Sequence, residues 1–159
     1  MKPDAQPLDL ASALPMLLAR AVAWAQSESD AVLAGGIPLR PAELEIARRV
    51  GVLQPERIRV GVVQQLPLPA DPELRAAALQ TGLLGPTMIG LTLGYAVLIR
   101  NGHEADPRLL SHEFRHVFQY EAAGSIAAFL PGYLQQIVQF GYFNAPLEAD
   151  ARAHELHGA

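Results

Sequence analysis

The chain has 159 residues and a formal net charge of -4, and half of its residues are hydrophobic, which predicts a single globular domain (1–159) and excludes a disordered polypeptide. The negative charge leaves no basic surface for a phosphate backbone, so we expect no nucleic-acid partner. Because cysteine is absent, any metal ion must be bound by histidine and carboxylate side chains.

Two helices are predicted in residues 1–52. The first covers residues 10–34, which are rich in alanine and leucine, and a pair of glycines ends it. The second covers residues 41–50, because it has proline at the first helical position and glycine just past its end. We expect these helices to form a layer against residues 53–159.

The N-terminal apolar stretch also imitates a secretory signal, because it ends in an Ala-Trp-Ala sequence at residues 23–25. A signal needs positive charge before its apolar run and no charge within it. Here Asp4 and Asp9 come before the run and Arg20 lies inside it. We therefore expect a cytoplasmic protein.

Residues 53–106 are predicted to contain two strands and one helix. Alternation over residues 57–63 indicates the first strand, and an Asp-Pro cap begins a helix over residues 72–81. Residues 88–100 alternate with a period of two, which predicts one continuous strand before an Asn-Gly turn. Strands and helices in this order predict an α+β fold, mostly helical, with a small sheet.

Three further helices are expected after residue 106. A second Asp-Pro cap begins a helix over residues 107–123, which Gly124 ends. Residues 125–140 are helical in pattern, but Pro131-Gly132 should divide them into two pieces. A last helix should begin near residues 144–146 and extend to Leu156. The strand at 88–100 would then precede the 107–123 helix as an edge strand.

Two long uncharged runs invite comparison with membrane spans. The run at residues 76–99 contains four glycines and a proline, and the run at residues 122–147 contains three glutamines, so neither suits a transmembrane helix. The apolar segment at residues 125–140 supports a third functional class, a helical protein that contacts a membrane surface or binds a partner. Flotation with liposomes would test it.

The most informative motif is His112-Glu113-Phe114-Arg115-His116. Positions four apart lie on one face of a helix, so both imidazoles can reach one ion while Glu113 lies beside a water bound to it. This H-E-x-x-H pattern is typical of zinc metallopeptidases, and it lies within a predicted helix, as the motif requires. We therefore predict Zn2+ as the cofactor, with His112 and His116 as ligands and Glu113 as the general base.

A catalytic zinc site needs a third protein ligand. We choose Glu148, because a helix beginning at the preceding proline could fold back against the motif helix. Asp150, His154 and Glu155 are the alternatives. Glu121 is disfavoured, because nine residues after His112 it points to the opposite side of the same helix.

Three segments carry a resemblance to small bacterial zincin-like domains of the gluzincin type: the glycine-rich residues 90–94, Leu-Leu-Ser-His-Glu at 109–113 and Ala-Pro-Leu-Glu-Ala-Asp-Ala at 145–151. In those domains a glycine-rich strand precedes the H-E-x-x-H helix, and a glutamate in a similar segment is the third ligand. The resemblance implies a zinc metallopeptidase fold, with Glu148 as the third ligand beside the two histidines. The segment around Glu148 departs from the N-E-x-x-S-D form of well-studied gluzincins.

Other residues are candidates for supporting roles. Tyr142, His154 or Tyr120 could donate a hydrogen bond to the oxyanion that forms during hydrolysis. Asp150 could orient a ligand histidine through its free ring nitrogen. The strand at 88–100, as an edge strand beside the site, could pair with an extended substrate.

The sequence thus predicts a zinc-dependent metallopeptidase that hydrolyses a peptide or protein substrate with activated water. The alternative is a catalytically inactive binding or assembly module with a structural or vestigial metal site. Retention of Glu113 favours the enzyme, because a structural site needs no general base. Neither the cleavage specificity nor the oligomeric state follows from the sequence.

Overall fold

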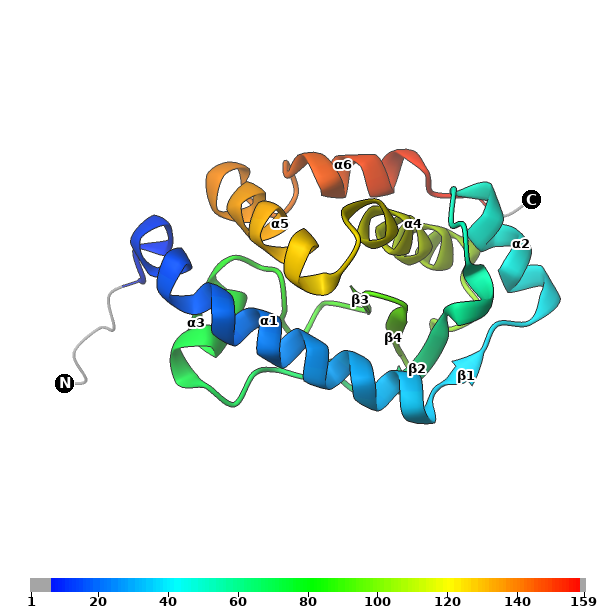
Figure 1. The fold of residues 1–159 in the computed structure, drawn as a ribbon, viewed down its shortest axis with the longest axis horizontal. Helices are drawn as coiled ribbons and strands as arrows, with labels where there is room; N and C mark the ends of the chain where they lie inside the picture. The colour runs from blue at the N-terminus through cyan, green and yellow to red at the C-terminus, as the bar shows by residue number, and fades with distance from the viewer. Residues whose placement is uncertain (1–6, 158–159) are drawn as a thin grey trace.

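The computed structural model describes residues 7–157, and in this range the chain forms six α-helices, one 3₁₀-helix and four strands (Figure 1). Their bounds are α1 Leu10–Gly35, β1 Ile37–Pro38, α2 Pro41–Arg49, η1 Pro55–Arg57, β2 Arg59–Val63, α3 Pro72–Gln80, β3 Gly90–Leu93, β4 Ala96–Arg100, α4 Pro107–Ala123, α5 Ile126–Phe140 and α6 Pro146–Ala153. The predicted α+β class is confirmed. Asp4, which entered the argument against a secretory signal, lies outside the described residues.

The strands form one mixed sheet in the order β1-β2-β4-β3. β2 and β4 are parallel, whereas the outer strands pair with them in the antiparallel direction. Ala96, Val97, Leu98 and Ile99 of the inner strand β4 are at most 3% exposed. A strand that is apolar at every position needs cover on both faces of the sheet.

That cover comes from different helices on the two faces. Val97 and Ile99 pack with Phe114 and Val117 of α4 and with Ala47 of α2. On the other face, Ala96 and Leu98 pack with Val32 of α1. The fold therefore has three layers, with α1 on one side of the sheet, α2 and α4 on the other, and α5 and α6 beside α4 (Figure 1).

The prediction of one continuous strand over residues 88–100 is wrong. Gly94 and Tyr95 form a tight turn between β3 and β4, and Gly94 has a φ of +68°, which glycine adopts without strain. The period-two pattern continues through the turn, so it gives no sign of the reversal. β3 is consequently the outer strand of the hairpin, and β4 connects to α4.

The prediction that Pro131-Gly132 divides the next helix is also wrong, because α5 is continuous from Ile126 to Phe140. Ser125 caps its first turn by accepting a hydrogen bond from the Ala128 amide (3.0 Å). The last helix is shorter than expected, since α6 ends at Ala153 rather than extending to Leu156.

The remaining helices lie close to their predicted positions. α1, α2 and α3 differ from the expected ranges by a residue or so at their C-terminal ends. Across residues 7–157, no helix combines the length and the apolar character that a membrane crossing requires.

Candidate metal centre

The helix α4 presents both motif histidines to the same side. It begins where the Asp106 side chain accepts a hydrogen bond from the Arg108 amide, and it ends at Gly124 in the left-handed conformation. The His112 and His116 rings lie one helical turn apart, with centroids 5.0 Å from each other. Both imidazoles therefore lie on one face of the helix, as their spacing predicts.

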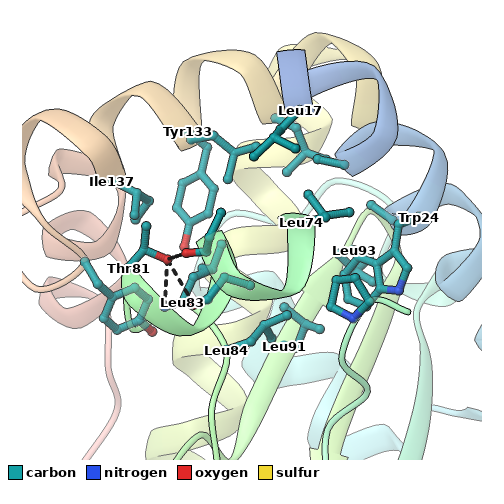
Figure 2. Close-up of a pocket in the computed structure, with 18 of the residues that line it drawn as sticks. Leu17, Trp24, Leu74, Thr81, Leu83, Leu84, Leu91, Leu93, Tyr133 and Ile137 are labelled. Atoms are coloured by element: carbon teal, nitrogen blue, oxygen red, sulfur yellow. Dashed lines mark hydrogen bonds between the residues drawn. The ribbon is translucent and has the colours of Figure 1, made fainter. Parts of the chain in front are cut away.

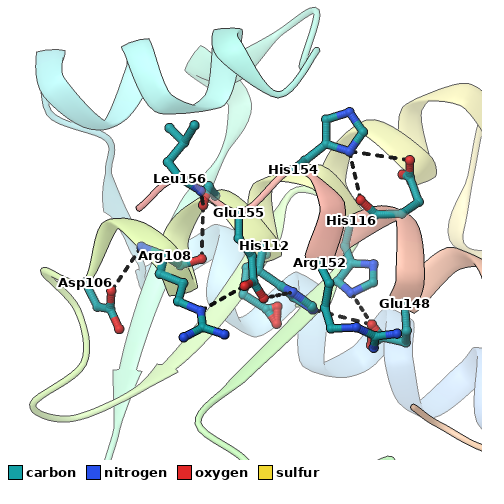
Figure 3. Close-up of polar contacts among 12 residues, drawn as sticks. Asp106, Arg108, His112, His116, Glu148, Arg152, His154, Glu155 and Leu156 are labelled. Atoms are coloured by element: carbon teal, nitrogen blue, oxygen red, sulfur yellow. Dashed lines mark hydrogen bonds and ion pairs between the residues drawn. The ribbon is translucent and has the colours of Figure 1, made fainter. Parts of the chain in front are cut away.

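The structure brings Glu148 of α6 to the two histidines. Its Oε2 lies 2.8 Å from His116 Nε2 and 3.4 Å from His112 Nε2, and its residue is 1% exposed (Figure 3). Among the described residues, these three offer ligand atoms that all lie within 4.8 Å of one another. The choice of Glu148 over its alternatives agrees with this placement.

The second ring nitrogen of each histidine has its own acceptor. His112 Nδ1 lies 3.0 Å from Glu155 Oε1, and His116 Nδ1 lies 2.7 Å from Gln119 Oε1. Gln119 in turn donates from Nε2 to the Leu147 carbonyl, at 2.9 Å. Its amide orientation is thus fixed by a backbone carbonyl, and its oxygen must accept a hydrogen bond from His116 Nδ1–H.

These contacts determine which nitrogen of each ring carries the proton. A carboxylate and an amide oxygen are acceptors only, so Nδ1 of both rings must be the donor. In a neutral imidazole, Nε2 then carries a lone pair. The lone pairs of His112 and His116 both face Glu148 Oε2, so three electron-rich atoms converge on one position and require a cation, either a proton or a metal ion, to hold them together.

The donor set fits zinc. Tetrahedral Zn2+ with ligands at about 2.0–2.1 Å separates neighbouring ligand atoms by about 3.3 Å. The separations of 2.8 and 3.4 Å from Glu148 Oε2 to the two imidazoles are close to that value. Two neutral imidazoles and one carboxylate also match the usual ligands of a catalytic zinc site. His112, His116 and Glu148 could therefore bind the ion with small adjustments.

Without a metal ion, protons take the same position. Burial alone would lower the pKa of His116, but the hydrogen bond and the charge of Glu148 outweigh it and raise the pKa to about 9. The pKa of His112 is raised in the same way. Burial works to raise the pKa of Glu148, yet its bonds to both histidines hold that pKa far below its usual value. Glu148 is thus ionised at neutral pH.

The C-terminal segment fixes the outer side of His112. Glu155, an alternative for third ligand in the sequence analysis, instead accepts from His112 and from Arg108 Nε, at 2.8 Å (Figure 3). The Leu156 amide donates to Ser111 Oγ on α4, also at 2.8 Å. These contacts hold the segment after α6 against α4.

Glu113 lies between α4 and β3 with 5% of its surface exposed. The Thr92 hydroxyl lies 3.0 Å from its backbone carbonyl and 3.3 Å from its Oε2. A Cβ at Gly90 would come within 3.0 Å of the Glu113 carboxyl group, so the strand can approach this closely because that residue is glycine. Burial raises the pKa of Glu113, against the attraction of the two histidines.

The predicted supporting residues divide into two groups. Asp150 does not touch a histidine of the motif: it binds Arg115 and the Gln119 amide at 2.8 and 2.9 Å, so it reaches His116 only through Gln119. The His154 ring faces the Asp150 carbonyl, at 2.8 Å, and makes no contact with the cluster.

Tyr120 and Tyr142 both line a pocket that also contains Glu113, His116 and Glu148. Burial raises the pKa of each tyrosine well above its ordinary value, with carboxylate charge adding to the effect, so both remain protonated donors.

Sequence reasoning missed Tyr133, Gln119 and Thr92. The Tyr133 hydroxyl donates to Glu148 Oε1 at 3.2 Å from α5. Gln119 could have been found, because it follows His116 by three residues and therefore lies beside it on the helix. Thr92 gave no local signal, since its contact with Glu113 depends on how the hairpin packs against α4.

The pocket extends from the cluster between α1, α3, α5 and β3 (Figure 2). Leu17 and Trp24 of α1, Leu74 of α3 and Tyr133 of α5 stand around it. Its volume is about 120 Å³. The candidate base and two of the three candidate ligands therefore lie at the wall of a largely apolar cavity.

Comparisons with protein families, with curated proteins and with solved structures gave no match for this chain. The functional argument therefore depends on the geometry and chemistry of the cluster itself.

Proposed function

We propose that this protein is a zinc-dependent metallopeptidase that hydrolyses peptide bonds. His112, His116 and Glu148 would bind Zn2+, and Glu113 would act as the general base. The observation that carries the proposal is the convergence of two imidazole lone pairs on Glu148 Oε2, at 2.8 and 3.4 Å. Three protein ligands leave one tetrahedral position for water or substrate, as catalytic zinc sites do.

Zinc supplies a Lewis acid that polarises the substrate carbonyl and makes water acidic near neutral pH. Glu113 follows directly after a ligand and lies at the pocket wall, where its carboxylate could take a proton from the attacking water. Burial raises its pKa, which brings a carboxyl group closer to the range in which a general base is effective. Glu113 would then return the proton to the leaving amine.

Tyr142 is our candidate for the donor that stabilises the oxyanion. It lines the pocket near Glu148, and its raised pKa keeps the hydroxyl proton in place. Tyr133 is the second candidate: its hydroxyl donates to Glu148 Oε1 at 3.2 Å, and Tyr142 also interacts with Glu148. His154 is set aside, because its ring faces the Asp150 carbonyl instead of the cluster.

β3 is suited to positioning an extended substrate. It is the outer strand of the sheet, and all four of its residues line the pocket beside Glu113. In an antiparallel pair, backbone groups point alternately toward the partner strand and away from it. The Arg100 amide donates to the Ile89 carbonyl (2.9 Å), so the groups of Gly90 and Thr92 should point away from β4. A peptide could pair with them by strand addition.

Metal content and hydrolysis should be measured together on three proteins. Wild-type protein should bind one zinc per chain and cleave a mixed peptide library. Glu113→Gln should keep its zinc and lose at least about 100-fold in rate, because general acid-base catalysis contributes about 10²–10⁴-fold. His116→Ala should lose both.

Two results would contradict the proposal in different ways. Unchanged hydrolysis in Glu113→Gln would refute the role of the base. Stoichiometric zinc without hydrolysis of any library member would support the alternative, a catalytically inactive module with a structural metal ion.

A further inference from the structure

The pocket beside the metal centre is polar at one end only. Apart from Glu113, His116 and Glu148, none of its lining residues carries a charge. The rest of the wall is aliphatic or aromatic, with threonine and tyrosine hydroxyls as its few polar groups. A ligand group that enters the pocket beyond the cluster would therefore have to be apolar, because an unpaired charge is costly to bury there.

The pocket is long for its volume. α1 lines it from Leu10 to Ala25, and fifteen residues of helix extend about 22 Å. α5 lines the facing side from Phe129 to Val138. A compact cavity of about 150 Å³ accommodates benzene. Here about 120 Å³ lies along several helical turns, so the space suits a single hydrocarbon chain better than a ring.

Small residues of two helices form part of that wall. Ala21 and Ala25 on α1, with Ala77 and Ala78 on α3, put small side chains toward the pocket. Larger residues at such positions would fill it. The alanines therefore leave room that the neighbouring leucines do not occupy, as a preformed ligand site requires.

We propose that this pocket binds an unbranched aliphatic chain, and that the substrate is an amide whose carbonyl carbon carries such a chain. This inference rests on the proposed zinc-dependent hydrolysis and extends it from peptide bonds to the amide bond of a linear acyl group. The reaction adds the oxygen of water to the carbonyl carbon and breaks the C–N bond. The products are a linear carboxylic acid and an amine, and the amine nitrogen receives a proton from Glu113.

The test uses neutral amides of increasing length: N-methylbutanamide, N-methylhexanamide, N-methyloctanamide and N-methyldecanamide. Dissociation constants are measured by calorimetry on metal-free and on zinc-loaded wild-type protein. Each methylene buried should tighten binding about fourfold until the pocket is filled. N-methylcyclohexanecarboxamide should bind at least about 10-fold more weakly than the linear heptanamide with the same number of carbons.

A matched pair of variants on α3 locates the binding site. Ala77 lines the pocket, whereas the neighbouring Ala76 is exposed and does not. Ala77→Phe should weaken the binding of N-methyloctanamide at least about 10-fold, because the ring fills the space for the chain. Ala76→Phe should bind as wild type does, and circular dichroism would verify that both variants are folded.

Affinity that does not change with chain length would overturn the inference, as would equal or tighter binding of the cyclic amide. These measurements use wild-type protein and do not depend on the folding of Ala77→Phe. Length-dependent binding in a protein that neither holds zinc nor hydrolyses amides would refute the proposed function while supporting the pocket assignment. Hydrolysis of amides regardless of chain length would do the reverse.

Discussion

Glu121 projects from α4 itself, whereas Glu148 reaches α4 from α6, and the two carboxylates meet different kinds of partner. Glu121 accepts from the Leu53 and Gln54 amides and from the Tyr95 hydroxyl, at 2.8, 3.0 and 2.7 Å. Burial and the hydrogen bond and charge of Glu121 raise the pKa of Tyr95 to about 12, so its hydroxyl keeps its proton at neutral pH, as the two backbone amides do.

Glu148 faces two imidazole nitrogens that can exchange a proton for a metal ion. The contrast separates two uses of a carboxylate. The donors to Glu121 cannot give up their protons, so Glu121 serves to link α4 to the loop before η1. The imidazoles beside Glu148 can give up theirs, so Glu148 can share a cation with them. The prediction that Glu121 points away from the histidines is confirmed.

The largest expected effect is on zinc affinity. Glu148→Gln removes the only anionic ligand and should weaken zinc binding at least about 100-fold, more than the 10–100-fold typical of outer partners. Glu121→Gln should leave zinc affinity unchanged and lower the free energy of unfolding by about 1 kcal/mol, because the amide accepts these partly exposed hydrogen bonds less strongly than the carboxylate does. Competition with a zinc chelator and urea unfolding measure the two quantities. Equal zinc affinity in the two variants would remove the distinction.

A smaller effect is expected where a carboxylate supports a ligand without binding the ion. Glu155→Ala leaves His112 Nδ1 without its acceptor and should weaken zinc binding about 10–100-fold. His154→Ala is the matched control, since this neighbouring side chain does not contact the cluster. If both variants bind zinc equally well, Glu155 does not position the ligand.

Thr92→Val tests how the pKa of Glu113, the candidate general base, is set. The change removes a hydroxyl 3.3 Å from Glu113 Oε2, whose hydrogen bond lowers the pKa of that group. The acidic limb of the pH-rate profile should therefore move to higher pH, with a rate loss of up to about 10-fold near neutral pH. Thr92→Ser keeps the hydroxyl and should retain the wild-type profile. An unshifted acidic limb in Thr92→Val would show that the contact does not tune Glu113.

The smallest effect is the pH dependence of thermal stability in metal-free protein. The pKa of His116 rises from 6.5 to about 9 on folding, so its stabilising contribution is complete below pH 6.5 and is lost as the pH rises through 9. The melting temperature should fall by a few degrees between pH 7 and pH 10. Zinc-loaded protein should lack this fall, because the metal ion replaces the proton. A fall of the same size with zinc bound would place its origin elsewhere.

The cluster of His112, His116 and Glu148 could be anticipated from the sequence because its strongest signal is local. Helical spacing places His112 beside His116, and the proline before α6 marks where Glu148 begins a new helix. The roles of Gln119 and Glu155 could not be anticipated in full, since each depends on how α6 and the following segment lie against α4. For Glu155 in particular, a carboxylate at this position of the sequence suits a metal ligand and an acceptor for a ligand histidine equally well.

The fold could be anticipated where caps and turns carry distinctive residues. Asp-Pro pairs mark the starts of α3 and α4, and both were placed correctly. The β3–β4 hairpin was missed because the alternation of residues 88–100 does not change where the chain reverses. In α5, Pro131 is accommodated because Phe129, Leu130 and Tyr133 pack into the core and stabilise the helix against the loss of one hydrogen bond.

The order of the chain gives the pocket one last consequence. The side chains that hold the two imidazole rings in place all come from residues 119–155, whereas α1, α3 and β3, which form much of the cavity wall, all precede residue 94. Much of the pocket wall and the side chains that hold the imidazoles are thus supplied by different stretches of the chain. Under the proposed function, substitutions before residue 90 would alter which molecules are accepted while the reactive groups stay in place.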